Sequence, residues 1–148
     1  MKISEVKLSV IIHEWDSYEK IKQKIFELLE GINKEKIEIN ENKGQGLISS
    51  TIYFIYIKIK DKISIKKFFK NILERLDDIN RFLEELNFDD NYNAYLRFDK
   101  EIFLKENKIV PMYGENVFHL KISMDFYKKD KESVKKFLKD FLSSLKDL

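Results

Sequence analysis

The sequence predicts an α+β fold: a two-layer sandwich with helices on one face of a mostly antiparallel sheet. Segments that alternate apolar and polar residues predict half-buried strands, and segments with apolar residues three and four positions apart predict helices. These segments follow one another in the order β-α-β-β-α-β-β-β-α. Strands and helices with one apolar face each bury those faces against one another, which produces two layers. We expect residues 1–148 to form a single domain, because this length suits one.

The first half of the chain contains strands and helices in alternation. In the first strand, Val6, Leu8 and Val10 share the apolar side. The expected elements are a strand at 2–13, a helix from Asp16 to Ile32, a strand at 36–39 broken by Gly44-Gln45-Gly46, a strand at 48–60, and a helix capped by Ser64 that runs, with a bend near Asp77-Asp78, to Leu86.

The second half of the chain supplies the rest of the sheet and a closing helix. The expected elements are a loop at Asp89-Asp90-Asn91, strands at 95–98 and 102–110, a loop marked by Pro111 and Gly114, a strand at 117–127, and a helix that begins at Asp130. The inward-facing side chains are expected to include Leu8, Val10, Leu96, Phe98, Leu120 and Ile122.

Composition excludes several classes of protein. Apolar residues make up 43% and charged residues 36%, which is too apolar for a disordered chain and too charged for a membrane protein. The N-terminus lacks the apolar region of a signal peptide, so we expect a cytoplasmic protein. The absence of cysteine excludes disulfides and thiol nucleophiles. With only two histidines and no glycine-rich phosphate loop, the sequence predicts no metal site and no cofactor.

The outer face of the expected sheet combines aromatic side chains with cations. Its residues are Lys7, Ser9, Ile11, His13, Phe54, Tyr56, Lys58, Tyr95, Arg97, His119 and Lys121. Such a face can stack bases and neutralise phosphates, as in sheet-based RNA-binding proteins. Exposed aromatic patches also mark protein contacts, so a protein-interaction or dimerisation module that uses the same face remains an alternative.

Charge is unevenly distributed along the chain. Residues 58–70 are rich in lysine, whereas residues 74–90 are rich in acids. Lysines that meet phosphates release counterions and so give affinity that is independent of sequence. The predicted RNA contacts are Lys58, Lys60, Lys66, Lys67, Arg97, Lys100, Lys121, Phe54 and Tyr56. The acids Asp77, Asp78, Asp89 and Asp90 occupy a helix surface and a turn, where acids are ordinary, so we expect no metal-dependent nuclease and no enzyme.

One short motif resembles a known family. Leu96-Arg97-Phe98-Asp99-Lys100 follows an acidic helix and an Asp/Asn turn, and it resembles the Leu-Arg-x-Asp-Lys signature of an archaeal family of RNA-binding proteins and predicted exosome subunits. The resemblance extends to the strand that ends at His13-Glu14, the glycine turn at Gly44, the basic segment through Phe69, and the closing strand and helix. At the turn the chain departs from the family, which usually continues with Gly-Asn-Pro where this sequence has Gln45-Gly46-Leu47.

The resemblance carries its own expectations of fold and function. It implies an α+β fold similar to that of ribosomal protein L5. It also implies non-catalytic RNA binding in archaeal RNA processing, with RNA and exosome subunits as partners and with a homodimer as a possible assembly.

Overall fold

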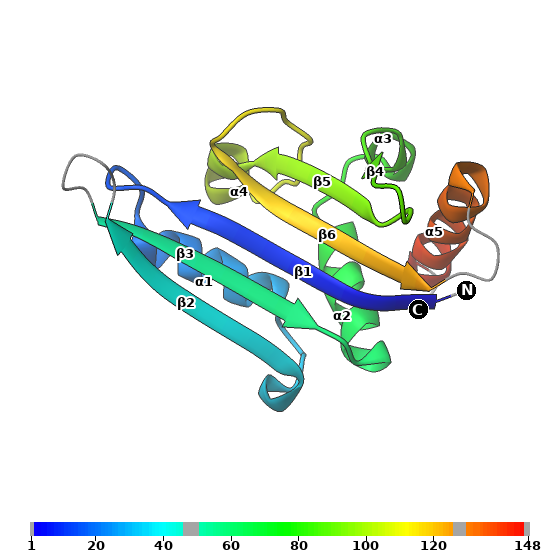
Figure 1. Ribbon diagram of the computed structural model, residues 1–148, viewed down its shortest axis with the longest axis horizontal. Helices are drawn as coiled ribbons and strands as arrows, with labels where there is room; N and C mark the ends of the chain where they lie inside the picture. The colour runs from blue at the N-terminus through cyan, green and yellow to red at the C-terminus, as the bar shows by residue number, and fades with distance from the viewer. Residues whose placement is uncertain (1, 46–50, 126–129, 147–148) are drawn as a thin grey trace.

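The computed structural model describes residues 2–45, 51–125 and 130–146. Its elements are β1 (Lys2–Ile12), α1 (Tyr18–Leu28), the 3₁₀ helix η1 (Lys34–Lys36), β2 (Ile37–Gln45), β3 (Thr51–Ile59), α2 (Lys62–Leu73), α3 (Ile79–Glu84), β4 (Asn87–Phe88), β5 (Ala94–Asp99), α4 (Lys100–Glu106), β6 (Val117–Asp125) and α5 (Lys131–Lys146). The strands form one six-stranded antiparallel sheet in the order β2-β3-β1-β6-β5-β4 (Figure 1). The expected two-layer α+β architecture is confirmed.

Strand register aligns the apolar side chains into rows that cross the sheet. Leu8 in β1 lies opposite Ile57 of β3 on one side and opposite Leu120 of β6 on the other. Leu96 in β5 continues this row, because it pairs with Leu120. The six side chains expected to face inward are all buried, with at most 2% exposed: Leu8, Val10, Leu96, Phe98, Leu120 and Ile122.

Helices cover this apolar face, and Figure 1 shows α1 and α2 behind the strands. Three rings from different elements meet in the core at one end of the sheet. Phe103 of α4 lies edge-on to Phe98 and Phe118, with ring centroids 5.5 and 5.3 Å apart. Edge-to-face rings at this distance add to the stabilisation that burial provides. The helix layer and the sheet therefore share one continuous core.

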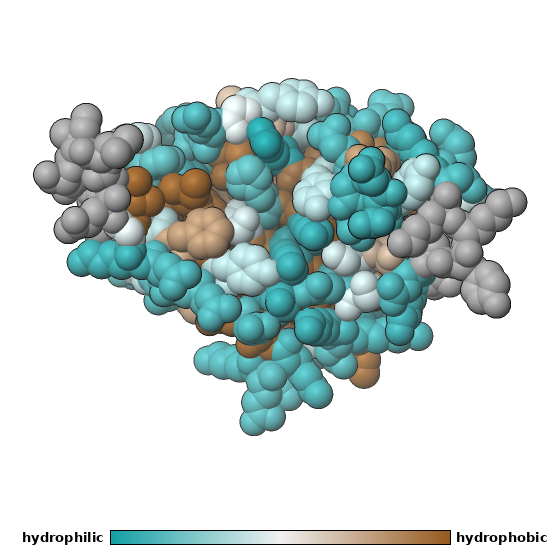
Figure 2. Space-filling view, viewed as in Figure 1, coloured by the Kyte–Doolittle hydropathy of each residue, from teal (hydrophilic) through white to brown (hydrophobic). Residues whose placement is uncertain are grey.

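The opposite face of the sheet is open in the described part of the chain. It faces the viewer in Figure 1, with no helix in front of the strands. Figure 2 shows the same face, where hydrophobic atoms are visible between hydrophilic ones. Because hydrophobic and hydrophilic side chains are mixed on it, this face differs from the apolar face that packs against the helices. Its aromatic rings are accessible to solvent.

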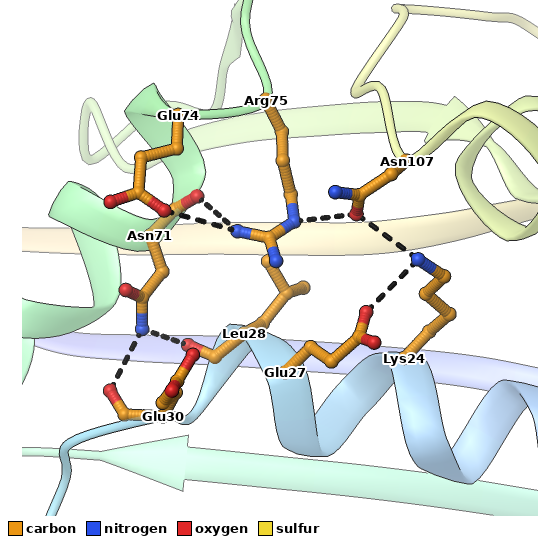
Figure 3. Close-up of polar contacts among 8 residues, drawn as sticks. All are labelled: Lys24, Glu27, Leu28, Glu30, Asn71, Glu74, Arg75 and Asn107. Atoms are coloured by element: carbon orange, nitrogen blue, oxygen red, sulfur yellow. Dashed lines mark hydrogen bonds and ion pairs between the residues drawn. The ribbon is translucent and has the colours of Figure 1, made fainter.

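Polar side chains join three helices on the covered side (Figure 3). The Asn71 amide of α2 donates to the carbonyl oxygens of Leu28 and Glu30, at 2.8 and 3.0 Å, just where α1 ends. The side-chain oxygen of Asn107, at the end of α4, accepts from Arg75 Nε at 2.8 Å and from Lys24 Nζ at 3.2 Å. The two bonds from Asn71 satisfy carbonyls that the C-terminus of α1 leaves without partners. Together with the bonds to Asn107, they fix the helices relative to one another.

The strand expected at residues 102–110 is wrong, because this segment contains helix α4. Asp99 accepts a hydrogen bond from the backbone of Ile102 at 3.0 Å and so caps the helix. Asn107 ends it in the left-handed conformation, with φ at 57°. These start and stop signals outweigh the β propensity of Ile102-Phe103-Leu104. Strand β5 instead pairs with β6 and with the short β4, so the Asp89–Asn91 loop joins β4 to β5.

Three further expectations about element boundaries need correction. Strand β2 continues through Gly44 to Gln45, since its whole length pairs with β3. Helix α2 is capped by Asp61, which accepts from the backbone and hydroxyl of Ser64 at 3.1 and 2.9 Å. The apolar stripe to Leu86 belongs to two helices, α2 and α3, and not to one bent helix.

Two segments of the expected fold lie outside the described residues. They are residues 46–50, which include part of the glycine turn, and residues 126–127 of the last expected strand. The likeness to ribosomal protein L5 stays a prediction. None of the described helices has the length and apolar character that a membrane span requires.

Candidate functional site

A trough of about 720 Å³ lies on the open face of the sheet. Strands β1, β3, β5 and β6 contribute to its lining, and the β4 region and the segment Pro111–Tyr113 contribute the rest. Four residues predicted as RNA contacts line it: Phe54, Tyr56, Arg97 and Lys121. Because they come from β3, β5 and β6, sheet register is what brings them together.

Aromatic rings and lysines lie side by side on the open face, on the trough floor and beside it. The rings of Phe54 and Tyr56 lie 6.5 Å apart at an angle of 23°. Tyr56 is flanked by Lys7 and Lys58, whose Nζ atoms are 5.7 and 5.9 Å from its ring centre. A hydrogen bond with Tyr56 raises the pKa of Lys7 above its usual value, so Lys7 stays fully charged at neutral pH. Lys121 lies similarly over Tyr95, with Nζ 5.5 Å from the ring centre.

Arg97 and His119 face each other across β5 and β6. Arg97 is exposed, and among the described residues no side-chain hydrogen bond or ion pair occupies its guanidinium. Burial, and then the charge of Arg97, lower the pKa of His119 below its ordinary value. His119 is therefore neutral at pH 7, and Arg97 is a free cation in the trough. A free cation on an open surface can bind an anion without first breaking a bond within the protein.

The segment Pro111–Tyr113 forms one wall of the trough. It is tied to β5 by a bridge between Pro111 and Phe98 and by a hydrogen bond of 2.9 Å from the Met112 backbone to the Arg97 carbonyl. Tyr113 is 70% exposed and Met112 41% exposed. The following Gly114 has φ of 132°, a conformation that side chains disfavour, and this allows the chain to turn back toward β6. The wall is thus an apolar surface fixed to the sheet.

The acidic residues near the trough serve structure more than metal binding. Asp89 accepts hydrogen bonds from the backbones of Asn91 and Asn93 and from the side chains of Asn93 and Tyr95. Burial alone would raise the pKa of Asp89, but these bonds lower it overall. Among the described residues, no group of three or more His, Cys, Asp or Glu side chains is arranged to hold a metal ion.

Lys100, predicted to contact RNA, lies instead in the protein interior. Its side chain is 1% exposed, and Nζ donates to Asp16 Oδ2 at 2.9 Å and to the Ile11 carbonyl at 2.7 Å. A lysine so buried and so bonded cannot reach a phosphate. The expectation for Lys100 is corrected: the residue joins the start of α4 to the turn between β1 and α1.

The remaining predicted lysines do not line the trough that contains Arg97. Lys58 lies on the open face, but Glu5 and Glu38 are 3.4 and 3.9 Å from its Nζ. Lys60 and Lys66 line a second, smaller cavity of about 310 Å³, together with Lys2 and Lys62. Lys67 projects from α2 in the helix layer and donates to the Gly31 carbonyl at 2.8 Å. The lysine-rich segment 58–70 is therefore divided between the open face of the sheet, the end of the sheet and the helix layer.

Several trough residues were not among the predicted contacts. Lys7, Tyr95 and His119 were placed on the open face by strand alternation but were not chosen as contacts. Glu85, Met112 and Tyr113 were missed altogether. The signal for Tyr113 was present, since an aromatic residue between Pro111 and Gly114 has no strand or helix in which to be buried. His13, expected on the same face, lies in the turn after β1 and stacks on Trp15 at 4.5 Å.

Known proteins resemble this chain over nearly its whole length. An uncharacterized protein of Methanocaldococcus jannaschii is 32% identical over 142 residues, which cover 88% of this chain and 91% of that protein. A protein of Pyrococcus abyssi named as RNA-binding is 26% identical over 148 residues, which cover 96% and 95% of the two chains. The crystal structure of a DUF54 protein from Sulfolobus solfataricus is 27% identical, with a TM-score of 0.76 over 95% of this chain and 98% of that one.

The family match covers the same elements that build the trough. Residues 5–124 match the family described as RNA binding, and this range runs from β1 almost to the end of β6. A DUF54 protein from Methanothermobacter thermautotrophicus, 18% identical, shares the fold with a TM-score of 0.70 over 95% and 98% of the two chains. The resemblance first noted at Leu96-Arg97-Phe98-Asp99-Lys100 is thereby confirmed. The match over residues 5–124, with the DUF54 name of the solved relatives, shows that the chain belongs to the DUF54 family, whose model is described as RNA binding.

Proposed function

We propose that the protein binds RNA, without cleaving it, in the trough on the open face of its sheet. The observation that supports this best is one hollow that combines exposed rings with cations that have no ion-pair partner among the described residues. RNA presents aromatic bases and phosphates at short intervals. Protein rings can stack on the bases, and protein cations can bind the phosphates. The family description and the name of the Pyrococcus abyssi relative agree with this choice of ligand.

The trough residues divide the work between phosphates and bases. Arg97, Lys121 and Lys7 are the proposed phosphate contacts, because their charges line the trough and no carboxylate lies within ion-pair distance of them among the described residues. Phe54 and Tyr56 are the proposed stacking platforms. Lys58 can contact a phosphate only if its ion pairs with Glu5 and Glu38 break.

Lysines at the end of the sheet extend the proposed path of the RNA. Lys60 and Lys66 surround the second cavity with Lys2 and Lys62, and we propose that they hold phosphates of an RNA that reaches beyond the trough. Lys67 stays a predicted contact, and it would have to leave the Gly31 carbonyl to bind a phosphate.

The family resemblance supports proposals about cellular context. We propose that the protein acts in the cytoplasm of an archaeon with the RNA-processing machinery, and that exosome subunits are partners. A homodimer is part of the same proposal. Among the described strands, β2 pairs on one side only, with β3, so its other edge is available to a second chain.

RNA binding measured at several salt concentrations tests the proposed site. The double variant Arg97→Ala/Lys121→Ala should lower affinity and flatten the plot of log affinity against log salt by about 1.4 units, since each lost phosphate contact on a single strand removes about 0.7. The double variant Lys20→Ala/Lys139→Ala is the matched control, because it removes the same charge from exposed positions on α1 and α5. The RNA should remain intact with or without Mg²⁺.

Each other outcome has a definite meaning. Equal losses in the two double variants would show that only net charge matters, and the trough would not be the site. If the wild-type protein binds no RNA, the alternative function of the open face, a protein-interaction or dimerisation surface, would be favoured. RNA cleavage that disappears in an Asp89→Asn/Asp90→Asn variant would overturn the non-catalytic assignment.

A further inference from the structure

The trough has the dimensions of a pocket for a small ring system. Its volume of about 720 Å³ falls within the range of roughly 300–1,000 Å³ that is typical of small-ligand sites. The sheet forms its floor, and Pro111–Tyr113 and the β4 region form its walls. A double helix presents a convex surface with its bases stacked inside, so its bases could not enter such a hollow. A group that projects from a flexible strand could enter.

The aromatic lining requires a ligand with free ring faces. Phe54 is 37% exposed and Tyr113 is 70% exposed, so both rings offer surface to the solvent. In a double helix each base is covered above and below by its neighbours, and only its edges are accessible. Bases can stack on protein rings only where the RNA is single-stranded or a base is splayed out. The lining therefore favours unpaired nucleotides.

Charge gives the trough two chemically different sides. The cations Lys7, Lys121 and Arg97 lie on the strands β1, β6 and β5. The carboxylates of Glu85 and Asp89 lie on the wall near β4, and that of Asp89 is already occupied by hydrogen bonds. A phosphate is attracted to the first side and repelled from the second. A nucleotide would therefore place its phosphate over the cations and its base edge toward Glu85.

Glu85 is available to receive a hydrogen-bond donor. Among the described residues, the Tyr113 hydroxyl is the one side-chain donor to this carboxylate, and it lies 3.4 Å from Oε2. That distance is long for a hydroxyl donor, so the contact is weak and easily exchanged. An ionised carboxylate only accepts hydrogen bonds. It can pair with the exocyclic amino group of cytosine, as acidic side chains do in nucleic-acid recognition. Uracil has a carbonyl oxygen at that position and would be repelled.

We propose that the trough selects single-stranded RNA and that Glu85 favours cytosine over uracil at the base it receives. This inference rests on the proposed function, because it assigns a ligand form and a base preference to the same site. Cytosine and uracil differ at the exocyclic group and share their size, backbone and stacking area, so a preference between them isolates the contact with Glu85.

Binding of three labelled RNAs, followed by fluorescence anisotropy, tests the inference. The probes are oligocytidine, oligouridine of the same length, and a blunt RNA duplex. The wild-type protein should bind both single strands more tightly than the duplex. It should also bind oligocytidine about 2- to 10-fold more tightly than oligouridine, the range expected for one additional hydrogen bond.

Variants identify the residue that causes the preference. Glu85→Gln should bring the two single strands to equal affinity, because an amide can donate to uracil as well as accept from cytosine. Glu84→Gln is the matched control, since Glu84 is an exposed neighbour outside the trough and should keep the preference. Tyr113→Ala should weaken both single strands equally, and Tyr113→Phe should not. Circular dichroism of each variant checks that it folds.

The outcomes distinguish a failure of this inference from a failure of the proposed RNA binding. If no probe binds, the proposed function itself fails. If the duplex binds as tightly as the single strands, or if the two single strands bind equally to the wild type, RNA binding stands and the inference is overturned. A preference for cytosine that persists in Glu85→Gln also overturns the role of Glu85.

Discussion

Five consecutive residues, Leu96 to Lys100, have four different roles. Leu96 and Phe98 are buried on the covered face of the sheet, and Arg97 between them is exposed in the trough. Asp99 caps helix α4, and Lys100 forms an internal ion pair with Asp16. Strand alternation explains the first three, since neighbours in a strand face opposite sides. The burial of Lys100 has no local signal, because its partner lies 84 positions away in the chain.

Removing Lys100 should destabilise the protein and leave the trough residues unaltered. Lys100→Met leaves the carboxylate of Asp16, itself only 10% exposed, without its cation. The free energy of unfolding should fall by about 3–5 kcal/mol, the usual cost when one partner of a buried pair is lost. Urea denaturation measures this change. Lys105→Met is the control, because its ion pair with Glu101 is exposed at the surface. Equal effects of the two variants would contradict the structural role of Lys100.

Because of His119, we expect acid to lower the free energy of unfolding and to raise the affinity for RNA. The pKa of His119 is lowered in the folded protein, so the unfolded chain binds the proton more readily, and lowering the pH below about 6.5 should reduce the free energy of unfolding. The same proton adds a positive charge to the trough, so RNA affinity should rise. His119→Gln should remove both dependences, whereas His13→Gln, outside the trough, should keep them. Titration of binding and of unfolding between pH 7 and about 5 provides the measurement.

At the scale of the elements, local pattern predicted every strand of the sheet that has a strong alternation. β1, β3, β5 and β6 alternate clearly, and their buried sides were identified correctly. The edge strand β2 was expected to be shorter, because Glu38, Asn40 and Asn42 have low β propensity, and pairing with β3 overrides it. Helix α4 was missed, since its cap Asp99 also ends a strand and the two signals share one residue.

The contact between α1 and α2 should depend strongly on Asn71. Its amide supplies both hydrogen bonds to the carbonyls at the end of α1. Asn71→Ala leaves those carbonyls without their donor, and the free energy of unfolding should fall by about 1–3 kcal/mol. Asn80→Ala, at an exposed position of α3, is the matched control for the change in helix propensity. Thermal or urea unfolding of both variants measures the difference, and a similar stability for the two would argue against the role given to Asn71.

For the whole molecule, the sequence predicted the composition of the open face but not its shape. Phe54, Tyr56, Arg97 and Lys121 could be placed together because strand alternation assigns a side to each residue. The wall made by Pro111–Tyr113 depends on how a loop folds back onto β5, and no periodic pattern describes a loop. The separation of Arg97 from the lysines of α2 likewise depends on which layer α2 occupies.

From the position of the second cavity we expect that the length of the RNA determines which lysines contribute to its affinity. Lys2 and Lys7 are five positions apart on β1, so this cavity lies about 17 Å from the trough along the strand. A trinucleotide should bind wild type and Lys60→Ala/Lys66→Ala equally. For a long single strand, the variant should lower affinity and flatten the salt dependence by about 1.4 units. Isothermal titration with RNAs of increasing length measures the point at which the two proteins diverge. No divergence at any length would confine the RNA to the trough.

The trough is assembled from residues that range from Lys7 to Lys121, and no single stretch of the chain contains it. A ligand that fits only the assembled hollow cannot bind the unfolded chain, so it draws the folding equilibrium toward the native state. At about a hundredfold excess over the dissociation constant, this adds about 2.7 kcal/mol to the free energy of unfolding. A cell rich in the right RNA would therefore keep more of this protein folded and out of reach of its proteases. The supply of ligand would then control how long each copy survives as well as how many copies are occupied.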